Sequence, residues 1–141
     1  MTDVAIPAVQ APAPPAIPDF EIVPRKGLPI VGVLLTALVV AIAVDKLWPL
    51  EFLHVVFGAA WTVMDLFLGL VLGPIMGRLS IPARIEFTTR LMPKMVLIMP
   101  TVVTITLAAG WQLGALLGTI QSSYPHHGWI VASYIVVGAM R

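Results

Sequence analysis

Four long apolar segments divide the sequence after residue 27. They cover residues 28–44, 52–76, 93–120 and 129–140. An α-helix rises about 1.5 Å per residue, so about 20 apolar residues cross the hydrocarbon core of a bilayer. Only 11% of the residues are charged, whereas a typical soluble domain carries about 25%. The sequence therefore predicts an all-α fold, a polytopic transmembrane bundle of about four helices surrounded by lipid.

Residues 1–26 differ in composition from the rest of the chain, because six of the thirteen prolines lie there. Proline fixes φ and lacks an amide donor, so we expect a disordered, solvated tail. The tail has no charged stretch followed by an apolar run and a cleavage site, so it is not a secretory signal. A segment that docks on a partner is the alternative. Residues 27–141 then form the transmembrane domain.

The fourth segment, residues 129–140, is short for a membrane crossing. Twelve helical residues reach roughly 18 Å, against about 30 Å of hydrocarbon. Either this segment spans part of the bilayer, or the natural chain continues beyond Arg141. We favour the second interpretation, because a charged residue is a typical start of a loop.

The distribution of basic residues predicts the orientation in the membrane. They lie before the first segment, between the second and third, and after the fourth: Arg25, Lys26, Arg78, Arg84, Arg90, Lys94 and Arg141. The other two connections have no excess of positive charge. Because basic loops stay on the cytoplasmic side, we expect both termini in the cytoplasm.

Charge and composition also exclude several functions. A net charge of +1 provides no basic field that would hold nucleic acid. Without cysteine the chain has no disulfides, iron–sulfur clusters, thiolate zinc sites or cysteine nucleophiles. No nucleophile–base pair or phosphate-binding loop is evident, so an enzyme is the less favoured class.

Two glycine ladders lie in the second and third segments. Their members are spaced by four residues: Gly69, Gly73 and Gly77, then Gly110, Gly114 and Gly118. Such spacing places small residues on one helix face, where another backbone can approach closely. Because the second and third segments run antiparallel, the two ladders would lie at different depths in the membrane. Each ladder should therefore pack against a different helix. Contact in a homo-oligomer is the alternative.

A polar stripe marks one face of the second segment. His54, Gly58, Trp61 and Asp65 lie within roughly 40° of one line on a helix. A carboxylate inside the bilayer costs several kcal/mol unless it is paired or faces water, so we expect Asp65 to face the bundle and to bond a threonine. A proton or ion path, or the orientation of a histidine ligand, are alternatives. A facing stripe on the third segment contains Lys94, Thr101 and Gln112.

His54, His126 and His127 are predicted near the outer end of the bundle. Two imidazoles from different helices at one depth are what a six-coordinate haem b or an imidazole-ligated copper site requires. Gly58 would leave room for a flat macrocycle, and Trp61 lies on the same stripe. The alternative is an interfacial histidine capped by a backbone carbonyl group.

Part of this pattern resembles known families. Leu53-His54, then Trp61, then Leu72-Gly73-Pro74 is similar to small bacterial membrane proteins of the copper-resistance protein D-like group, and the run from Arg90 to Gly110 resembles them too. The histidine–tryptophan spacing is also similar to the HemJ-type protoporphyrinogen oxidases, four-helix proteins that bind haem b. This resemblance implies a bacterial inner membrane, a helical bundle that can hold haem, and His54 as the haem ligand.

The chain also departs from the HemJ-type pattern. Thr62-Val63-Met64-Asp65 stands where that family has a Tyr-Leu-Pro-Arg run, and Trp129–Met140 has no counterpart of its lysine. The oxidase activity is therefore not implied. Our leading hypothesis is a membrane protein that binds haem b, or else copper, through His54. The competing hypothesis is an accessory subunit of a larger membrane complex that binds partners through its helix faces.

Overall fold

The structure is a computed structural model that describes residues 23–139, and all regular elements in that range are helical. In chain order they are the 3-10 turn η1 (Arg25–Gly27), α1 (Leu28–Val44), α2 (Leu47–Leu66), the π-helical η2 (Phe67–Leu72), α3 (Gly73–Arg78), α4 (Ile81–Leu116) and α5 (His127–Ala139). The expected all-α architecture is confirmed. Residues 1–22 of the expected disordered tail lie outside the described residues.

Three helical rods are long and apolar enough to cross a membrane. They are Arg25–Val44, the continuous rod Leu47–Arg78 formed by α2, η2 and α3, and Ile81–Leu116. The fourth helix, α5, is apolar but shorter. Many large apolar side chains are exposed, such as Trp48 at 73% and Leu70 at 72%. A water-soluble surface rarely shows large apolar patches, so these features indicate a membrane protein.

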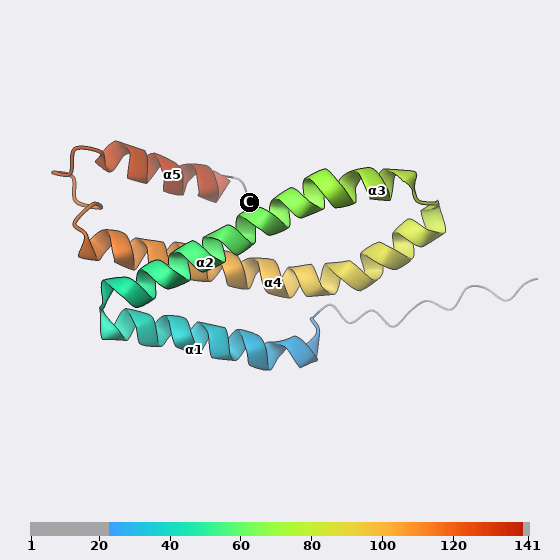
Figure 1. Ribbon diagram of the computed structural model, residues 1–141, viewed down its shortest axis with the longest axis horizontal. Helices are drawn as coiled ribbons and strands as arrows, with labels where there is room; N and C mark the ends of the chain where they lie inside the picture. The colour runs from blue at the N-terminus through green and yellow to red at the C-terminus, as the bar shows by residue number, and fades with distance from the viewer. Residues whose placement is uncertain (1–22, 140–141) are drawn as a thin grey trace, which may run out of the picture.

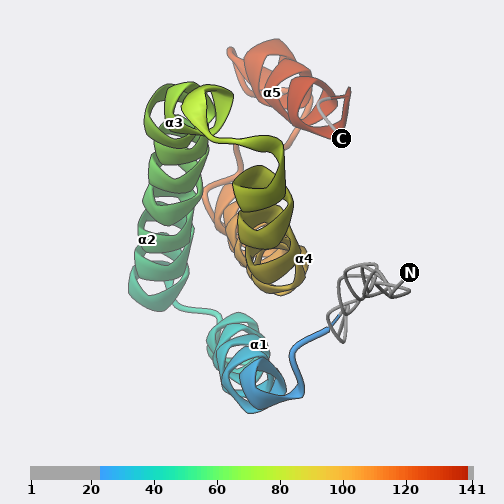
Figure 2. The same ribbon diagram turned by 90° about the vertical axis from the view of Figure 1, so that its right-hand side faces the viewer.

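Helix α4 is the centre of the arrangement. Figures 1 and 2 place α1 and α5 on opposite sides of α4, while α2 crosses it obliquely. The contact between α2 and α4 is the most extensive in the fold. The buried core joins three helices through Leu38 and Ala41 of α1, Leu50 of α2, and Ile105 and Ala109 of α4. Thr101, Val102 and Thr106 of α4 are also buried, whereas most of the large apolar side chains in the described range remain partly or fully exposed.

Three helices begin earlier than the sequence predicted, and for α5 the difference is only two residues, His127 instead of 129. The second rod begins at Leu47 rather than 52, because Pro49 falls in the first turn, where the missing amide costs nothing. The third rod begins at Ile81 rather than 93, with Pro82 in its first turn and Pro93 inside it. The basic stretch assigned to a loop therefore lies mostly on α4, and Leu79–Ser80 alone form the connection.

Helix α4 ends at Leu116, four residues before the predicted boundary. Gly118 has φ of +68°, which glycine adopts without strain. Its amide donates to the Ala115 carbonyl (3.1 Å) and the Thr119 amide donates to the Gly114 carbonyl (3.0 Å), a Schellman closure. Gly118 is therefore the helix stop and not the third member of a packing ladder.

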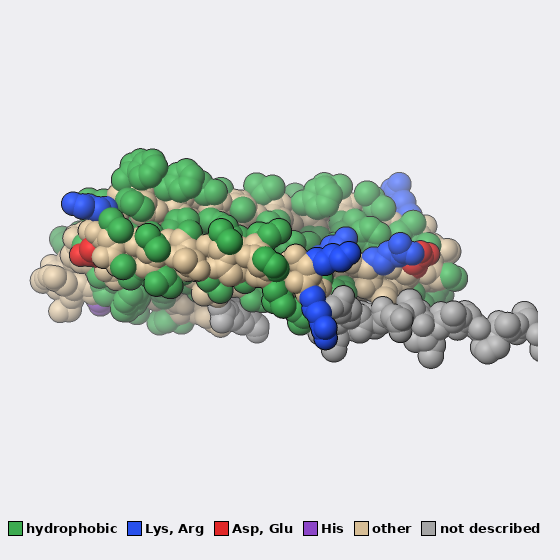
Figure 3. All heavy atoms as spheres, turned by 90° about the horizontal axis from the view of Figure 1, so that it is seen from below, with side chains coloured by type: hydrophobic (Ala, Val, Ile, Leu, Met, Phe, Trp, Pro, Cys, Tyr) green, Lys and Arg blue, Asp and Glu red, His purple; other side chains and the backbone are tan. Residues whose placement is uncertain are grey.

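Apolar and charged groups are separated along the molecule. In the view of Figure 3, apolar side chains follow the length of the bundle, whereas basic and acidic groups gather toward its two ends. Helix α4 itself follows a curved path in Figure 1, and it carries Pro93 and Pro100 in its interior. Each proline removes a helix hydrogen bond, which accounts for the bend.

Candidate functional site

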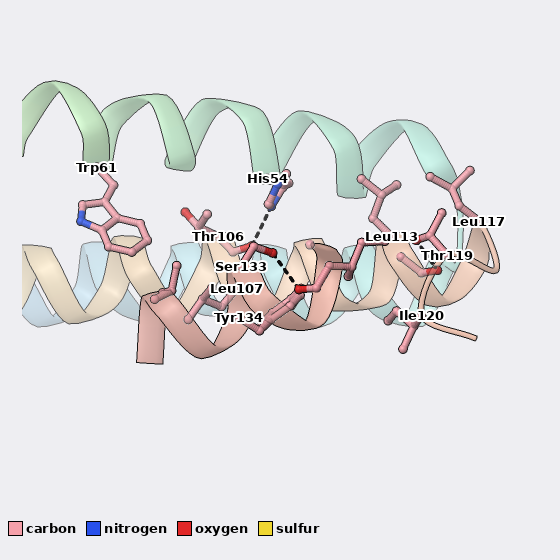
Figure 4. A pocket seen from close by; sticks show the side chains of 14 residues that line it. His54, Trp61, Thr106, Leu107, Leu113, Leu117, Thr119, Ile120, Ser133 and Tyr134 are labelled. Carbon is pink, nitrogen blue, oxygen red and sulfur yellow. Dashed lines mark hydrogen bonds between the residues drawn. The ribbon is translucent and has the colours of Figure 1, made fainter. Parts of the chain in front are cut away.

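A cavity of about 390 Å³ lies between α2, α4 and α5. Its walls include His54 and Trp61 from α2, Thr106 and Gly110 from α4, and Tyr134 from α5. In Figure 4 the side chains of His54 and Trp61 point from α2 toward the other two helices. Six of the fourteen lining residues are Leu, Ile or Val, and both the size and the largely apolar walls are typical of small-molecule sites.

The imidazole of His54 is held by a backbone carbonyl group. Its Nδ1 atom lies 2.8 Å from the carbonyl oxygen of Thr106 on α4 (Figure 4). Because a carbonyl oxygen only accepts, Nδ1 carries a proton, and in the neutral imidazole Nε2 then keeps its lone pair. No group within residues 23–139 forms a hydrogen bond with Nε2. The same arrangement, with one ring nitrogen donating to a carbonyl, orients histidines that ligate metals.

Gly110 makes room for this imidazole. A Cβ atom on residue 110 would lie 2.6 Å from both Cε1 and Nδ1 of His54, and 3.4 Å from the Tyr134 hydroxyl oxygen. Helices α2 and α4 are also close at Gly58, where a Cβ atom would lie 3.4 Å from the Thr106 methyl group, an ordinary van der Waals distance. Gly110 is therefore the glycine that allows the imidazole to lie between α2 and α4.

Several lining hydroxyl groups are already satisfied. Those of Thr106, Thr119 and Ser133 donate to the carbonyl oxygens of Val102 (2.9 Å), Gly114 (3.2 Å) and Ile130 (2.7 Å). Tyr134 packs edge-on against Trp111, with ring centroids 5.5 Å apart. His54 and Tyr134 both line the cavity, and no described residue forms a hydrogen bond with His54 Nε2 or with the Tyr134 hydroxyl group. Tyr134 was not among the residues expected from the sequence, although a phenol in an apolar segment was a usable signal.

The structure does not bring the three histidines together. His127 lines a separate hollow of about 350 Å³ with Trp111 and Tyr134, and its Nδ1 is buried without a hydrogen-bond partner among the described residues. His126 is exposed and packs edge-on against Tyr124. His54 lies seven residues into α2, about 10 Å from its start, whereas His127 is the first residue of α5. The expected pairing at one depth therefore fails within one chain.

Asp65 does not face the bundle, which contradicts the prediction. It is exposed, and no residue in the described range bonds its carboxylate. The reason is the oblique crossing in Figure 1, since α2 contacts α4 closely near Gly58 and diverges beyond it. The first glycine ladder continues along this diverging rod. Gly69 and Gly77 have no neighbouring atom within 4 Å of a Cβ position, and Gly73 has only the Leu68 carbonyl oxygen of its own rod.

The polar residues predicted on α4 have three separate roles. Thr101 is buried, and its hydroxyl donates to the Leu97 carbonyl oxygen (2.7 Å) of its own helix. Lys94 is exposed beside α1. The Gln112 side-chain amide donates to Asp45 Oδ1 at 2.9 Å, which ties α4 to the turn between α1 and α2. None of these three residues reaches the carboxylate of Asp65.

The donor set fits haem better than copper. Within residues 23–139 no three His, Cys, Asp or Glu side chains are placed to hold a metal ion together, and copper sites in proteins commonly combine several nitrogen or sulfur ligands. A haem iron can be held by one proximal histidine, which His54 Nε2 provides.

Comparison with protein-family models, with curated proteins and with solved structures found no match for this chain.

Proposed function

We propose that this protein binds haem b in the cavity between α2, α4 and α5, with Nε2 of His54 as the axial ligand. The observation that carries the proposal is the hydrogen bond of His54 Nδ1 to the Thr106 carbonyl oxygen, because it fixes the tautomer in which Nε2 is a ligand. A bound haem would supply redox or ligand-binding chemistry at its iron. We propose no catalytic reaction.

The surroundings of His54 support a flat, largely apolar ligand. Gly110 and Gly58 keep the facing surfaces of α4 and α2 free of bulk near the imidazole. The cavity is lined by aliphatic residues, with Trp61 and Tyr134 as aromatic neighbours. This chain places one imidazole there, so His54 is the only histidine ligand it offers to a haem.

Titration of the purified full chain with haem tests this proposal. We expect a red-shifted Soret band and a saturable stoichiometry of one haem per chain in detergent or nanodiscs. His54→Ala should abolish the shift. His126→Ala is the matched control, because His126 is exposed and outside the cavity, and it should bind haem normally. Equal spectra for both variants, or no binding by the natural sequence, would refute the haem site.

The membrane and orientation belong to the same proposal. A bacterial inner membrane follows from the resemblance, and cytoplasmic termini follow from the excess of basic residues at the end of the bundle that holds η1 and the α3–α4 connection. The chain has no cysteine, so single cysteines at Ser80 and Lys46 report cleanly. Membrane-impermeant maleimide should label Lys46→Cys in intact cells and Ser80→Cys only after lysis. The reverse pattern would contradict this orientation.

A second candidate function is that of a subunit in a membrane assembly. Asp65 and the ladder formed by Gly69, Gly73 and Gly77 face no other described helix. A small-residue face supports close helix packing in membranes, and a carboxylate there is costly without a partner. A homo-oligomer or another membrane subunit would cover this face. Gly73→Leu should then reduce the assembled fraction in mild detergent, measured by light scattering, whereas Gly32→Leu on α1 should not.

A further inference from the structure

A second hollow of about 270 Å³ lies on the other side of α4, against α1 and η1. We call it the α1–α4 groove. Gly27 and Val31 form part of one wall, and Leu97 and Ile98 part of the other. Its walls are apolar apart from Lys94 and Thr101, whose hydroxyl already bonds the Leu97 carbonyl oxygen. The exposed lining surface is almost entirely apolar, so Lys94 contributes to the groove mainly through its aliphatic stem.

Lys94 carries a positive charge with no acidic partner among residues 23–139. The residue is exposed. Pro24 and Gly27 line the groove, and Lys26, which stands between them in the sequence, is exposed. The one acidic residue of α4, Glu86, is paired with Arg90 at 2.7 Å. Figure 3 shows several Lys and Arg side chains, with one acidic group beside them, in the right-hand part of the molecule.

We propose that the α1–α4 groove binds one anionic phospholipid. An acyl chain lies along the apolar walls, and the phosphate group contacts the Lys94 ammonium group near Lys26. Basic pockets between transmembrane helices are known to bind anionic headgroups, and a lysine stem can run along apolar surface while its ammonium group reaches the interface. The positive charge of Lys94 favours an anionic headgroup, and the apolar walls of the groove hold the acyl chain. This site is separate from the cavity at His54, because α1 and α5 lie on opposite sides of α4.

Photocrosslinking identifies the occupant. A benzophenone amino acid replaces Ile98 in the full chain, reconstituted in nanodiscs of equal phosphatidylglycerol and phosphatidylcholine. We expect an intact-mass adduct of one phosphatidylglycerol, enriched at least threefold over phosphatidylcholine. The matched control is the same replacement at Val96, which is half exposed on α4 and does not line the groove. That control should label both lipids without preference.

Two substitutions test the preference for the headgroup separately from the binding of the acyl chain. Lys94→Gln should lower the preference for phosphatidylglycerol about fivefold while lipid labelling continues. Arg78→Gln, at the same end of the bundle but outside the groove, should leave the preference unchanged. Because neither variant lies in the His54 cavity, haem titration of both should match the natural sequence and report correct folding.

Three outcomes would overturn the proposal. A crosslink from residue 98 to residues 1–22 would show that the N-terminal segment fills the groove. A crosslinked species of twice the chain mass would show a second copy there. Equal labelling of the two lipids at residue 98 would show that the groove holds acyl chains without headgroup selection.

Discussion

A Cβ atom on residue 110 would lie 2.6 Å from the imidazole of His54, so the position of that ring depends on a glycine in the facing helix. The carbonyl oxygen that holds the ring belongs to Thr106, one helical turn earlier. Glycine at 110 leaves this carbonyl group accessible from α2. A residue that resembles a packing element in the sequence is therefore also a positioning residue for His54.

Gly110→Ala should displace the imidazole and break its bond to Thr106. Loss of the hydrogen bond costs about 1 kcal/mol and overpacking about 1–3 kcal/mol, whereas alanine returns up to about 1 kcal/mol of helix propensity. We expect a net loss of about 1–3 kcal/mol in the free energy of unfolding and at least a tenfold weaker affinity for haem. Gly77→Ala is the control, because no atom lies within 4 Å of its Cβ position; it should leave the affinity for haem unchanged and raise the free energy of unfolding by up to about 1 kcal/mol. Equal behaviour of the two variants would contradict the positioning role.

The tautomer of His54 is a separate prediction. Since Nδ1 lies 2.8 Å from a carbonyl oxygen, ¹⁵N NMR of the histidine-labelled chain without haem should show a protonated Nδ1 and an unprotonated Nε2. His54→Gln removes this signal and assigns it. An Nε2–H tautomer would mean that the ring is capped in another way and that Nε2 is not available as a ligand.

The helices were predictable because their signals are local. Apolar length identified α1 at its exact bounds, Leu28–Val44, and indicated the other spans within a few residues where no proline intervened. The start of α4 was misplaced because proline and basic residues near it are typical of a loop. Pro82 instead lies in the first turn of the helix, and Pro93 is tolerated inside it. Hydropathy alone does not distinguish these positions.

The site was less predictable because it depends on how the helices cross. The stripe from His54 to Asp65 lies on one helix face, yet only its first part meets α4. The angle between α2 and α4 decides which stripe residues become buried, and no residue pattern within α2 encodes that angle. The partner of His54 is a backbone carbonyl oxygen, which leaves no mark in side-chain identity.

The turn between α1 and α2 offers a third test. Asp45 has φ of +51°, and its carboxylate accepts the hydrogen bond from Gln112. Asn tolerates this backbone region and can still accept through its side-chain oxygen, whereas a β-branched residue cannot adopt it without strain. Asp45→Asn should keep the stability within about 0.5 kcal/mol, and Asp45→Val should lose about 1–3 kcal/mol, measured by denaturation in bicelles. Gln112→Leu should lose about 1 kcal/mol. Equal stabilities of the Asn and Val variants would show that this turn is not constrained.

Asp65 gives the test that separates the isolated chain from an assembly. Asp65 lies in the middle part of the second rod, Leu47–Arg78, and its side chain is exposed. Inserting an aspartate at the centre of a transmembrane helix costs about 3 kcal/mol, whereas inserting a leucine is favourable. Asp65→Leu should therefore raise the insertion efficiency and the stability of the monomeric full chain by up to about 3 kcal/mol, while haem binding at His54 stays unchanged. Val63→Leu, on an exposed position nearby, should have little effect. If a partner helix covers this face, the same Asp65→Leu variant lowers the assembled fraction although each chain is more stable. A monomer destabilised by Asp65→Leu would instead place the partner of this carboxylate within the chain itself.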